Sequence, residues 1–144
     1  RSSRCGACAY AKLANEHAPQ RLDLSDPDWR AKMPGADPHH LLAIFCANVI
    51  HIAPWNVAEG LLAGAGRALR PDGRLFLYGP FKRGGKHTAV SNAVFDTSLR
   101  EGNPEWGVRD VDEVRMVAER HGLALQDAVE MPANNLIVAF SRAA

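Results

Sequence analysis

The stretch that most constrains the fold is residues 41–80, LLAIFCANVIHIAPWNVAEGLLAGAGRALRPDGRLFLYGP. Residues 41–46 form an uninterrupted apolar run, which is typical of a parallel strand buried on both faces. Residues 54–69 begin with a proline that suits a first helical position and then place apolar side chains at helical spacing. The Pro-Asp-Gly of residues 71–73 is turn-forming, and residues 74–78 alternate as a second strand. Two strands joined by a helix predict a right-handed βαβ unit.

Gly60 and Gly64 lie one turn apart on this predicted helix. Each weakens the helix by about 1 kcal/mol relative to alanine. Because they leave one face of the helix flat, we expect that face to lie close to the sheet.

The segments before and after this unit are less regular. Residues 5–17 are rich in alanine and predict a short helix end, and residues 21–24 predict a short strand. Residues 81–110 contain one candidate helix, at 91–99, and are too long to be a simple connection. They are therefore a candidate lid over a site, with Gly84-Gly85 as a hinge.

The last part of the chain predicts a helix followed by a hairpin. Asp110 can cap a helix over residues 110–122, Glu113 completes a capping box, and Gly122 ends it. Residues 123–130 and 136–140 are strands, and the short connection MPANN makes them antiparallel.

Composition limits the kind of protein. The 144 residues suffice for one domain with a core, and 47% hydrophobic and 23% charged residues are ordinary for a soluble protein. A net charge of +1 gives no reason to expect a nucleic acid or a membrane as partner. Three cysteines fit a reducing compartment, so we expect a cytoplasmic protein.

Two motifs are better explained by structure than by chemistry. Cys5 and Cys8 have metal or redox spacing, but a zinc site needs a second pair and only Cys46 remains, so no metal site is predicted. The glycines of residues 59–66 lack both a preceding strand and a glycine at position 69, so they predict a packed helix rather than a phosphate loop.

A candidate site follows the two predicted parallel strands. Asn48 and His51 come just after the first, and Tyr78, Gly79 and Pro80 end the second on the same side. Ligands of open α/β sheets bind outside these strand ends. An amide, an imidazole and a phenol there suit a binding or catalytic site. A structural role for His51, as a cap of the neighbouring helix, stays open as the alternative.

The order of these segments resembles the second half of class I S-adenosylmethionine-dependent methyltransferases, in which a helix runs through Leu-x-Pro-x-Gly into the fifth strand. More narrowly, the motifs NVIHIAPW, LYGPFK, HTAVSNAVFD, EWGVRD and EMPANNL resemble an uncharacterised family known as a domain of unknown function, which includes the methyltransferase-like twenty-six proteins. The resemblance covers residues 21–142. It implies an α/β fold with a Rossmann-like methyltransferase sheet, in which residues 136–140 lie antiparallel between 74–78 and 123–130.

The resemblance also implies site residues. The cofactor, S-adenosylmethionine, is expected at Asp23, Leu24, Asn48, Val49 and His51, with Asp23 matching the acid that commonly meets the adenine amino group. A small-molecule acceptor is expected in a pocket formed by Tyr78, Pro80, Phe81, His87, Asn92 and Asn134. His51 is the candidate base and Tyr78 the second candidate catalytic residue.

The glycine-rich cofactor loop and the ribose-binding acid of that family are absent here. We therefore expect a single partial domain over residues 1–144, with its core at 21–142, that is the N-terminally truncated form of the enzyme. Losing two or three hydrogen bonds of roughly 1.5–3 kcal/mol each predicts cofactor binding weaker by about two to six decades. The exposed apolar edge at residues 41–46 predicts self-association, unless residues 21–24 cover it.

Two other functions remain open. One is a non-catalytic binding or scaffold module that has lost the cofactor site. The other is a different Rossmann-like enzyme such as a reductase, which the missing Gly-x-Gly-x-x-Gly and the terminal hairpin disfavour. Fold analogy alone does not decide between them.

Overall fold

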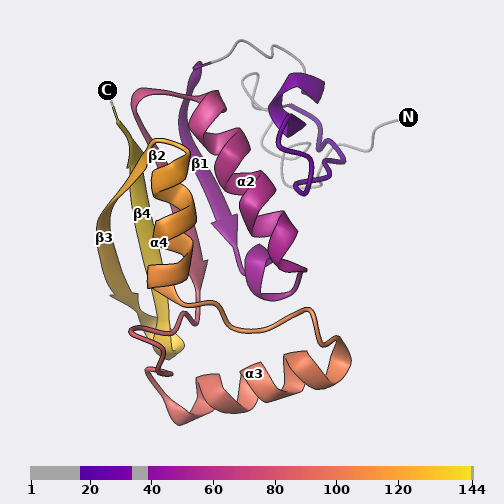
Figure 1. Cartoon of the computed structure of the whole chain (residues 1–144), viewed down its shortest axis with the longest axis vertical. Helices are drawn as coiled ribbons and strands as arrows, with labels where there is room; N and C mark the ends of the chain where they lie inside the picture. Colours follow the sequence, from indigo (N-terminus) through magenta and orange to yellow (C-terminus); the bar gives the residue numbers. More distant parts are fainter. Residues whose placement is uncertain (1–16, 34–38, 144) are drawn as a thin grey trace.

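The protein folds into a four-stranded mixed sheet with helices on one face (Figure 1). The computed structural model describes residues 17–33 and 39–143. Its strands are β1 (Leu41–Ala47), β2 (Leu69–Gly79), β3 (Leu123–Met131) and β4 (Asn135–Arg142), in the order β1-β2-β4-β3. The α-helices are α2 (Trp55–Ala68), α3 (Val90–Gly102) and α4 (Val111–Arg120). The 3-10 turns are η1 (Trp29–Lys32), η2 (Val49–His51) and η3 (Pro132–Asn134).

The sheet topology confirms the prediction from the sequence. β1 pairs parallel with β2, and β4 runs antiparallel to both β2 and β3. The pairing of Leu77 with Val138 places β4 between its two neighbours. The short connection at η3 explains why β3 and β4 are antiparallel, because so few residues can join antiparallel strands but cannot make a parallel crossover. The fold is the Rossmann-like α/β fold that the sequence predicts, with an antiparallel C-terminal hairpin.

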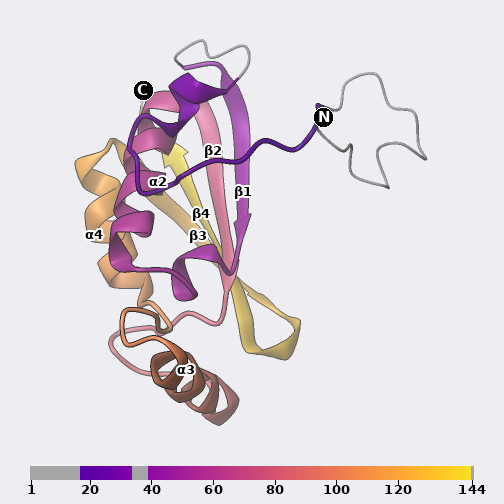
Figure 2. The same ribbon diagram turned by 90° about the vertical axis from the view of Figure 1, so that its right-hand side faces the viewer.

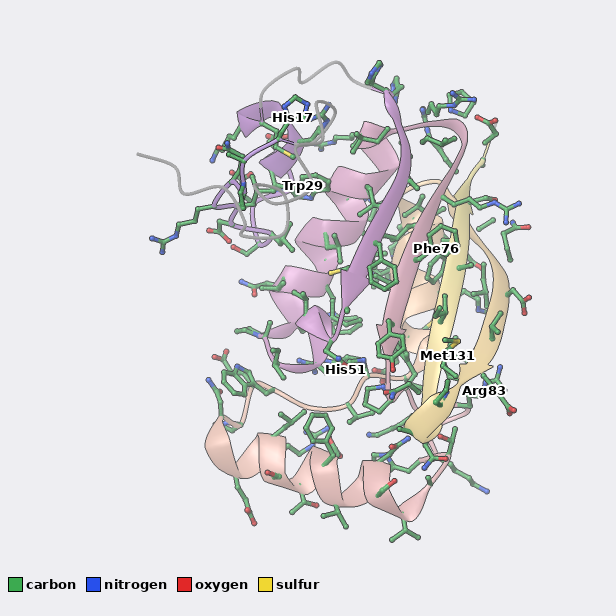
Figure 3. The ribbon with its side chains drawn as sticks, turned by 180° about the vertical axis from the view of Figure 1, so that it is seen from behind. His17, Trp29, His51, Phe76, Arg83 and Met131 are labelled. Atoms are coloured by element: carbon green, nitrogen blue, oxygen red, sulfur yellow. The ribbon has the colours of Figure 1, made fainter. Side chains whose placement is uncertain are left out.

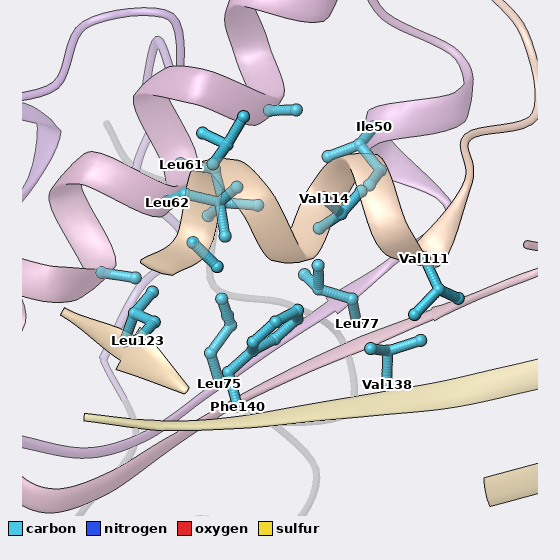
Figure 4. Packing of buried hydrophobic residues seen from close by; sticks show 14 of the residues in the cluster. Ile50, Leu61, Leu62, Leu75, Leu77, Val111, Val114, Leu123, Val138 and Phe140 are labelled. Carbon is cyan, nitrogen blue, oxygen red and sulfur yellow. The ribbon is translucent and has the colours of Figure 1, made fainter. Parts of the chain in front are cut away.

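The hydrophobic core lies between the sheet and two helices (Figure 4). Alternate residues of the central strands point to the same side, so Leu75 and Leu77 of β2 meet the helices that cover that side. The other fully buried contributors include Leu61, Leu62, Val114, Val138 and Phe140. The βαβ unit and the hairpin therefore share one core.

The first strand differs from the prediction, because only one of its faces is buried. Ile44 and Cys46 pack against the core, whereas Phe45, on the other face, is 63% exposed. Leu42 is 60% exposed and lies where the pairing with β2 shifts register. The reason is that α2 and α4 lie on the same face of the sheet (Figure 2), and β1 is an edge strand. The apolar run of residues 41–46 therefore forms an edge strand, and one face of this strand is exposed to solvent.

The segment before β1 also differs from the prediction. Residues 21–24 form an irregular stretch and a turn rather than a strand, so no described residue before β1 pairs with it as a strand. The glycine face of α2 was expected to lie close to the sheet. Gly60 and Gly64 instead contact the segment before β1. A Cβ at Gly60 would lie 2.0 Å from the Leu24 carbonyl oxygen, and one at Gly64 would lie 1.9 Å from Trp29 Nε1. The Trp29 indole N–H donates to the Gly60 carbonyl at 3.2 Å, which completes the contact.

The boundaries of two elements, β2 and α3, differ clearly from the prediction. β2 begins at Leu69, so the predicted turn at residues 71–73 lies within the strand as an irregularity, with Asp72 at φ +69°. α3 extends beyond the predicted 91–99 at both ends. Asp110 caps α4 as expected, accepting a hydrogen bond from the Asp112 amide at 2.8 Å. The helix predicted at residues 5–17 lies almost wholly outside the described residues.

Candidate functional site

A cavity of about 480 Å³ lies beyond the C-terminal ends of β1 and β2. It is bounded by the η2 loop, the end of β2, helix α3 and the tip of the β3–β4 hairpin. Its lining residues are Asn48, Ile52, Pro80, Ser91, Asn92, Phe95, Ala133 and Asn135. Three amides and one hydroxyl stand beside four apolar side chains, and the lining contains no charged residue. The cavity can therefore hold a small uncharged molecule with an apolar body and hydrogen-bonding groups.

The position of Asn48 follows from its backbone. It lies at φ +61°, in the left-handed region that asparagine tolerates better than most residues. Its amide N–H donates to the Tyr78 carbonyl at 2.8 Å, which ties the η2 loop to the end of β2. The structure thus brings Asn48 and Pro80, two residues predicted for the site, to one cavity wall.

Asn92 joins α3 to the hairpin tip. Its side-chain amide donates to the Asn134 carbonyl at 3.0 Å and to Thr88 Oγ1 at 3.2 Å. The Asn134 amide donates in turn to Ser91 Oγ at 3.3 Å. Asn134 itself lines a smaller neighbouring cavity of about 170 Å³. Both asparagines therefore connect α3 to the hairpin tip at η3, and Asn92 also lines the larger cavity.

His51 lies at the ends of β1 and β2, near α3 (Figure 3), and its side chain is fully buried. The Arg109 main-chain N–H donates to Nδ1 at 3.0 Å, and the Phe81 ring packs edge-on with ring centres 4.6 Å apart. Burial lowers the pKa of His51 to about 4, and the positive charge of Arg109 acts in the same direction. The imidazole is therefore neutral near pH 7 and lies beneath the cavity rather than in its lining.

Arg109 is a residue to which the sequence assigned no role. Its guanidinium donates to the carbonyl oxygens of Ile50 at 3.0 Å, Ala53 at 2.8 Å and Glu105 at 2.8 Å. It also lies 5.4 Å from the Trp55 ring centre, within range of a cation–π interaction. The only indication in the sequence was that Arg109 lies within the motif EWGVRD. The sequence did not predict which main-chain carbonyls Arg109 would contact. Arg109 holds the end of the 81–110 segment against the η2 loop.

The 81–110 segment is also held in place at Asp96. This buried carboxylate accepts hydrogen bonds from the Val108 amide at 2.8 Å and Arg100 Nε at 3.1 Å, and His87 Nε2 lies 3.4 Å away. Burial opposes ionisation, but the Val108 bond and the charges of Arg100 and Lys82 hold the pKa of Asp96 below its usual value. His87, predicted for the acceptor pocket, thus pairs with α3 instead of lining the larger cavity.

Other predicted pocket residues serve the fold. Tyr78 shares the outer face of the sheet with Phe76, as strand alternation requires, and only its carbonyl contacts the η2 loop. Phe81 is fully buried in the core against His51. Neither side chain is among those that line the larger cavity.

The predicted cofactor residues are divided between two places. Asn48 and Val49 lie in the loop after β1, as expected. Asp23 and Leu24 lie in the segment that packs beside α2, away from α3 (Figures 1 and 2). The Asp23 carboxylate accepts bonds from the hydroxyl and the amide of Ser25, at 2.6 and 3.0 Å, and these bonds lower its pKa. The structure therefore brings Asn48, but not Asp23, to the cavity.

Two kinds of feature are absent from the described residues. Within residues 17–33 and 39–143, no group of three or more His, Cys, Asp or Glu side chains could hold a metal ion. None of the helices in that same part of the chain is long and apolar enough to span a membrane.

Solved structures with the same fold include methyltransferases. An O-methyltransferase family protein from Burkholderia thailandensis is 13% identical, with a TM-score of 0.75, over 95% of this chain and 39% of its own. The mitomycin 7-O-methyltransferase MmcR is 18% identical, with a TM-score of 0.68, over 95% and 37%. CalO1, a methyltransferase of calicheamicin biosynthesis solved with SAH bound, is 16% identical, with a TM-score of 0.61, over 70% and 30%. The chain thus spans less than two fifths of each of these proteins.

The family model described as a protein of unknown function, DUF938, matches residues 3–142. This agrees with the resemblance to a domain of unknown function, while the narrower resemblance to the methyltransferase-like twenty-six proteins stays a prediction. Over nearly its whole length, with the fold of class I methyltransferases, this chain belongs to the DUF938 family.

Proposed function

We propose that this chain is the acceptor-binding part of an S-adenosylmethionine-dependent methyltransferase that acts on a small molecule. The observation that carries the proposal is the cavity at the C-terminal ends of two parallel strands, where ligands of open α/β sheets bind. Further support comes from the shared fold, because the neighbours that have it include a methyltransferase with SAH bound.

The residues of this chain fit only one end of the cofactor. S-adenosylmethionine supplies a methyl group on a positively charged sulfur, and the neutral amides and apolar groups around Asn48 and Pro80 carry no cation that would repel it. Asn48 and Val49 would hold that end. The Asp23 carboxylate bonds Ser25 outside the cavity, and the adenine contact expected for it stays a prediction.

The contribution of these residues to the reaction is mainly positioning. Asn48 and Asn92 can hold a hydroxyl or amine of the acceptor, and Phe95 and Ile52 can pack against its apolar body and exclude water. Methyl transfer then needs the acceptor's nucleophilic atom to be held in line with the sulfur–methyl bond. The acceptor class that this lining favours is uncharged, because no side chain in it can neutralise an ion.

The test uses the natural gene product that contains these residues, assayed for transfer of a labelled methyl group to uncharged aromatic alcohols and amines. Phe95→Ala and Asn48→Gly should each lower kcat/KM about tenfold, the equivalent of about 1.4 kcal/mol. Glycine is chosen at position 48 because it keeps the positive φ.

Val94→Ala is the matched control, since Val94 is on the same helix as Phe95 but points to solvent and is 65% exposed. This variant should retain full activity. Absence of transfer to every compound of this class, or equal losses in Val94→Ala and Phe95→Ala, would contradict the proposal.

A further inference from the structure

The two ring nitrogens of His51 have different surroundings. Nδ1 accepts a hydrogen bond from the Arg109 main-chain N–H at 3.0 Å. Nε2 is buried and has no hydrogen-bond partner among the described residues. A main-chain N–H can only donate, so Nδ1 must carry a lone pair and the proton of the neutral ring must be on Nε2. His51 is therefore a hydrogen-bond donor whose donor atom is unpaired.

Gly79 shows where this donor points. A Cβ added to Gly79 would lie 2.3 Å from His51 Nε2 and 3.3 Å from Asn48 Oδ1. The missing side chain leaves a small space on which a donor and an acceptor converge. Because a buried donor without a partner costs about 1–3 kcal/mol, a turn of the Asn48 side chain toward Nε2 would be favourable. That turn would leave the Asn48 NH₂ group facing the cavity.

Arg109 holds the arrangement in place. Its guanidinium bonds the carbonyls of Ile50 and Ala53, which stand on either side of His51 in the chain. The Gly107 N–H donates to the His51 carbonyl at 2.9 Å. These bonds keep the main-chain N–H of Arg109 within hydrogen-bond distance of His51 Nδ1. They thereby fix the tautomer of the ring.

We infer that Arg109 is a positioning residue that holds His51 as the Nε2–H tautomer, so that His51 orients Asn48 toward the acceptor instead of taking a proton from it. The inference rests on the proposed acceptor cavity. Its chemical consequence is that Asn48 presents a hydrogen-bond donor, which selects an acceptor whose reacting group is an oxygen or nitrogen with a lone pair.

The electrostatic surroundings agree with this role. Burial and the charge of Arg109 lower the pKa of His51 to about 4, while the main chain of Gly107 and the charge of Asp96 oppose that shift. The ring thus stays neutral throughout the range in which an ordinary histidine titrates. A neutral ring with Nδ1 engaged and Nε2 protonated has no lone pair to offer a substrate.

The test is a long-range ¹H–¹⁵N correlation spectrum of the histidine rings of the ¹⁵N-labelled chain, recorded without cofactor. Of the six histidines, His51 is identified by its cross-relaxation with the Phe81 ring. We expect a protonated Nε2 and a bare Nδ1, with shifts that do not change between about pH 8 and about pH 5. A protonated Nδ1, or titration near the ordinary histidine pKa, would overturn the inference.

A variant tests the part played by Arg109. Arg109→Lys keeps the charge but cannot bond both carbonyls, so the His51 nitrogen shifts should move toward the average of the two tautomers. Arg100→Lys is the control, since Arg100 pairs with Asp96, and should leave these shifts unchanged. Unchanged shifts in a folded Arg109→Lys chain would contradict the role of Arg109. Because no reaction is measured, a failure here is separable from a failure of methyl transfer.

Discussion

At the scale of single residues, the site depends on side chains that do not line it. Arg109 bonds His51 and the Ile50 carbonyl, and Gly79 leaves room for the His51 ring, although none of the three lines the cavity. Imidazole chemistry at a strand end suggests a catalytic group. The hydrogen bonds of this imidazole instead give it a positioning role in the proposal above.

Gly79→Ala should destabilise the protein, because the new Cβ would lie 2.3 Å from His51 Nε2 and force the ring to move. Overpacking of a core typically costs about 1–3 kcal/mol of unfolding free energy, measurable by urea denaturation. Gly102→Ala, at the end of α3, is the control, because its Cβ would meet no atom within 4 Å. If both variants unfold at the wild-type urea concentration, the packing described for Gly79 is incorrect.

The buried His51 should also make stability depend on pH. Its pKa is about 4 in the folded protein against 6.5 for an ordinary solvated histidine, so the unfolded chain binds the proton more readily. The contribution to stability is present above the unfolded pKa and is lost as pH falls from about 6.5 to about 4, by about 3 kcal/mol. The measurement is the unfolding free energy of wild type and of His51→Gln at several pH values. Equal pH slopes in the two proteins would refute this prediction.

At the scale of elements, α3 is the part most clearly held by a few polar contacts. It lies across the ends of the strands (Figure 1) and exposes Val90 and Val94 to solvent. Asn92 bonds it to the hairpin, and Asp96 bonds it to the segment that leads into α4. These two contacts decide how firmly the outer wall of the cavity is closed.

Asn92→Ala should loosen α3 from the hairpin tip, because it removes the bond to the Asn134 carbonyl. A net loss of about 1 kcal/mol of local stability corresponds to amide exchange faster by about fivefold to tenfold in α3 and η3. Thr97→Ala is the control, since Thr97 bonds only within its own helix, to the Ala93 carbonyl. Hydrogen-exchange mass spectrometry makes the measurement, and equal exchange in both variants would show that Asn92 does not tether the helix.

At the scale of the whole molecule, the sheet has one covered and one bare face. The outer side of β1 and β2 carries the cross-strand pair Phe45 and Phe76, and β1 leaves its outer edge unpaired among the described strands. Residues 41–47 contain no charge that would oppose pairing with an identical strand. We propose that two copies of the chain pair through these edges.

Sedimentation of the chain at increasing concentration should therefore show self-association. Phe45→Lys should shift the equilibrium toward the monomer, because edge lysines oppose strand pairing. Val90→Lys adds the same charge to an exposed site on α3 and should leave the association unchanged. A wild-type chain that stays monomeric at all concentrations would rule out edge pairing.

The affinity for S-adenosylmethionine depends on how much of the cofactor this chain can contact. The chain spans less than two fifths of the methyltransferases whose fold it shares, and Asp23 lies away from the cavity. We expect isothermal titration with S-adenosylmethionine to give binding weaker than micromolar, since contacts at one end of a ligand supply only part of its affinity. Micromolar binding would mean that other residues of this chain hold the rest of the cofactor.

Much of the fold follows from local patterns in the sequence. The periodicity of residues 54–69, the cap at Asp110 and the short connection at η3 predicted two helices and the hairpin, whereas the place of β4 was predicted by the family resemblance. The exposed face of β1 could not be predicted in this way, because an apolar run has the same appearance whether one or two of its faces are covered. What decides its burial is the placement of α2 and α4 on one face (Figure 2).

The site divides in the same way. The sequence by itself determined that Asn48 and Pro80 follow neighbouring parallel strands, because strand direction and alternation are local properties. Only the tertiary structure decided that Phe81 and His87 face the core and α3, that Arg109 supports His51, and that Gly60 receives Leu24. These contacts join residues far apart in the chain. Their geometry depends on how whole helices and strands pack, and local sequence patterns do not determine those distances.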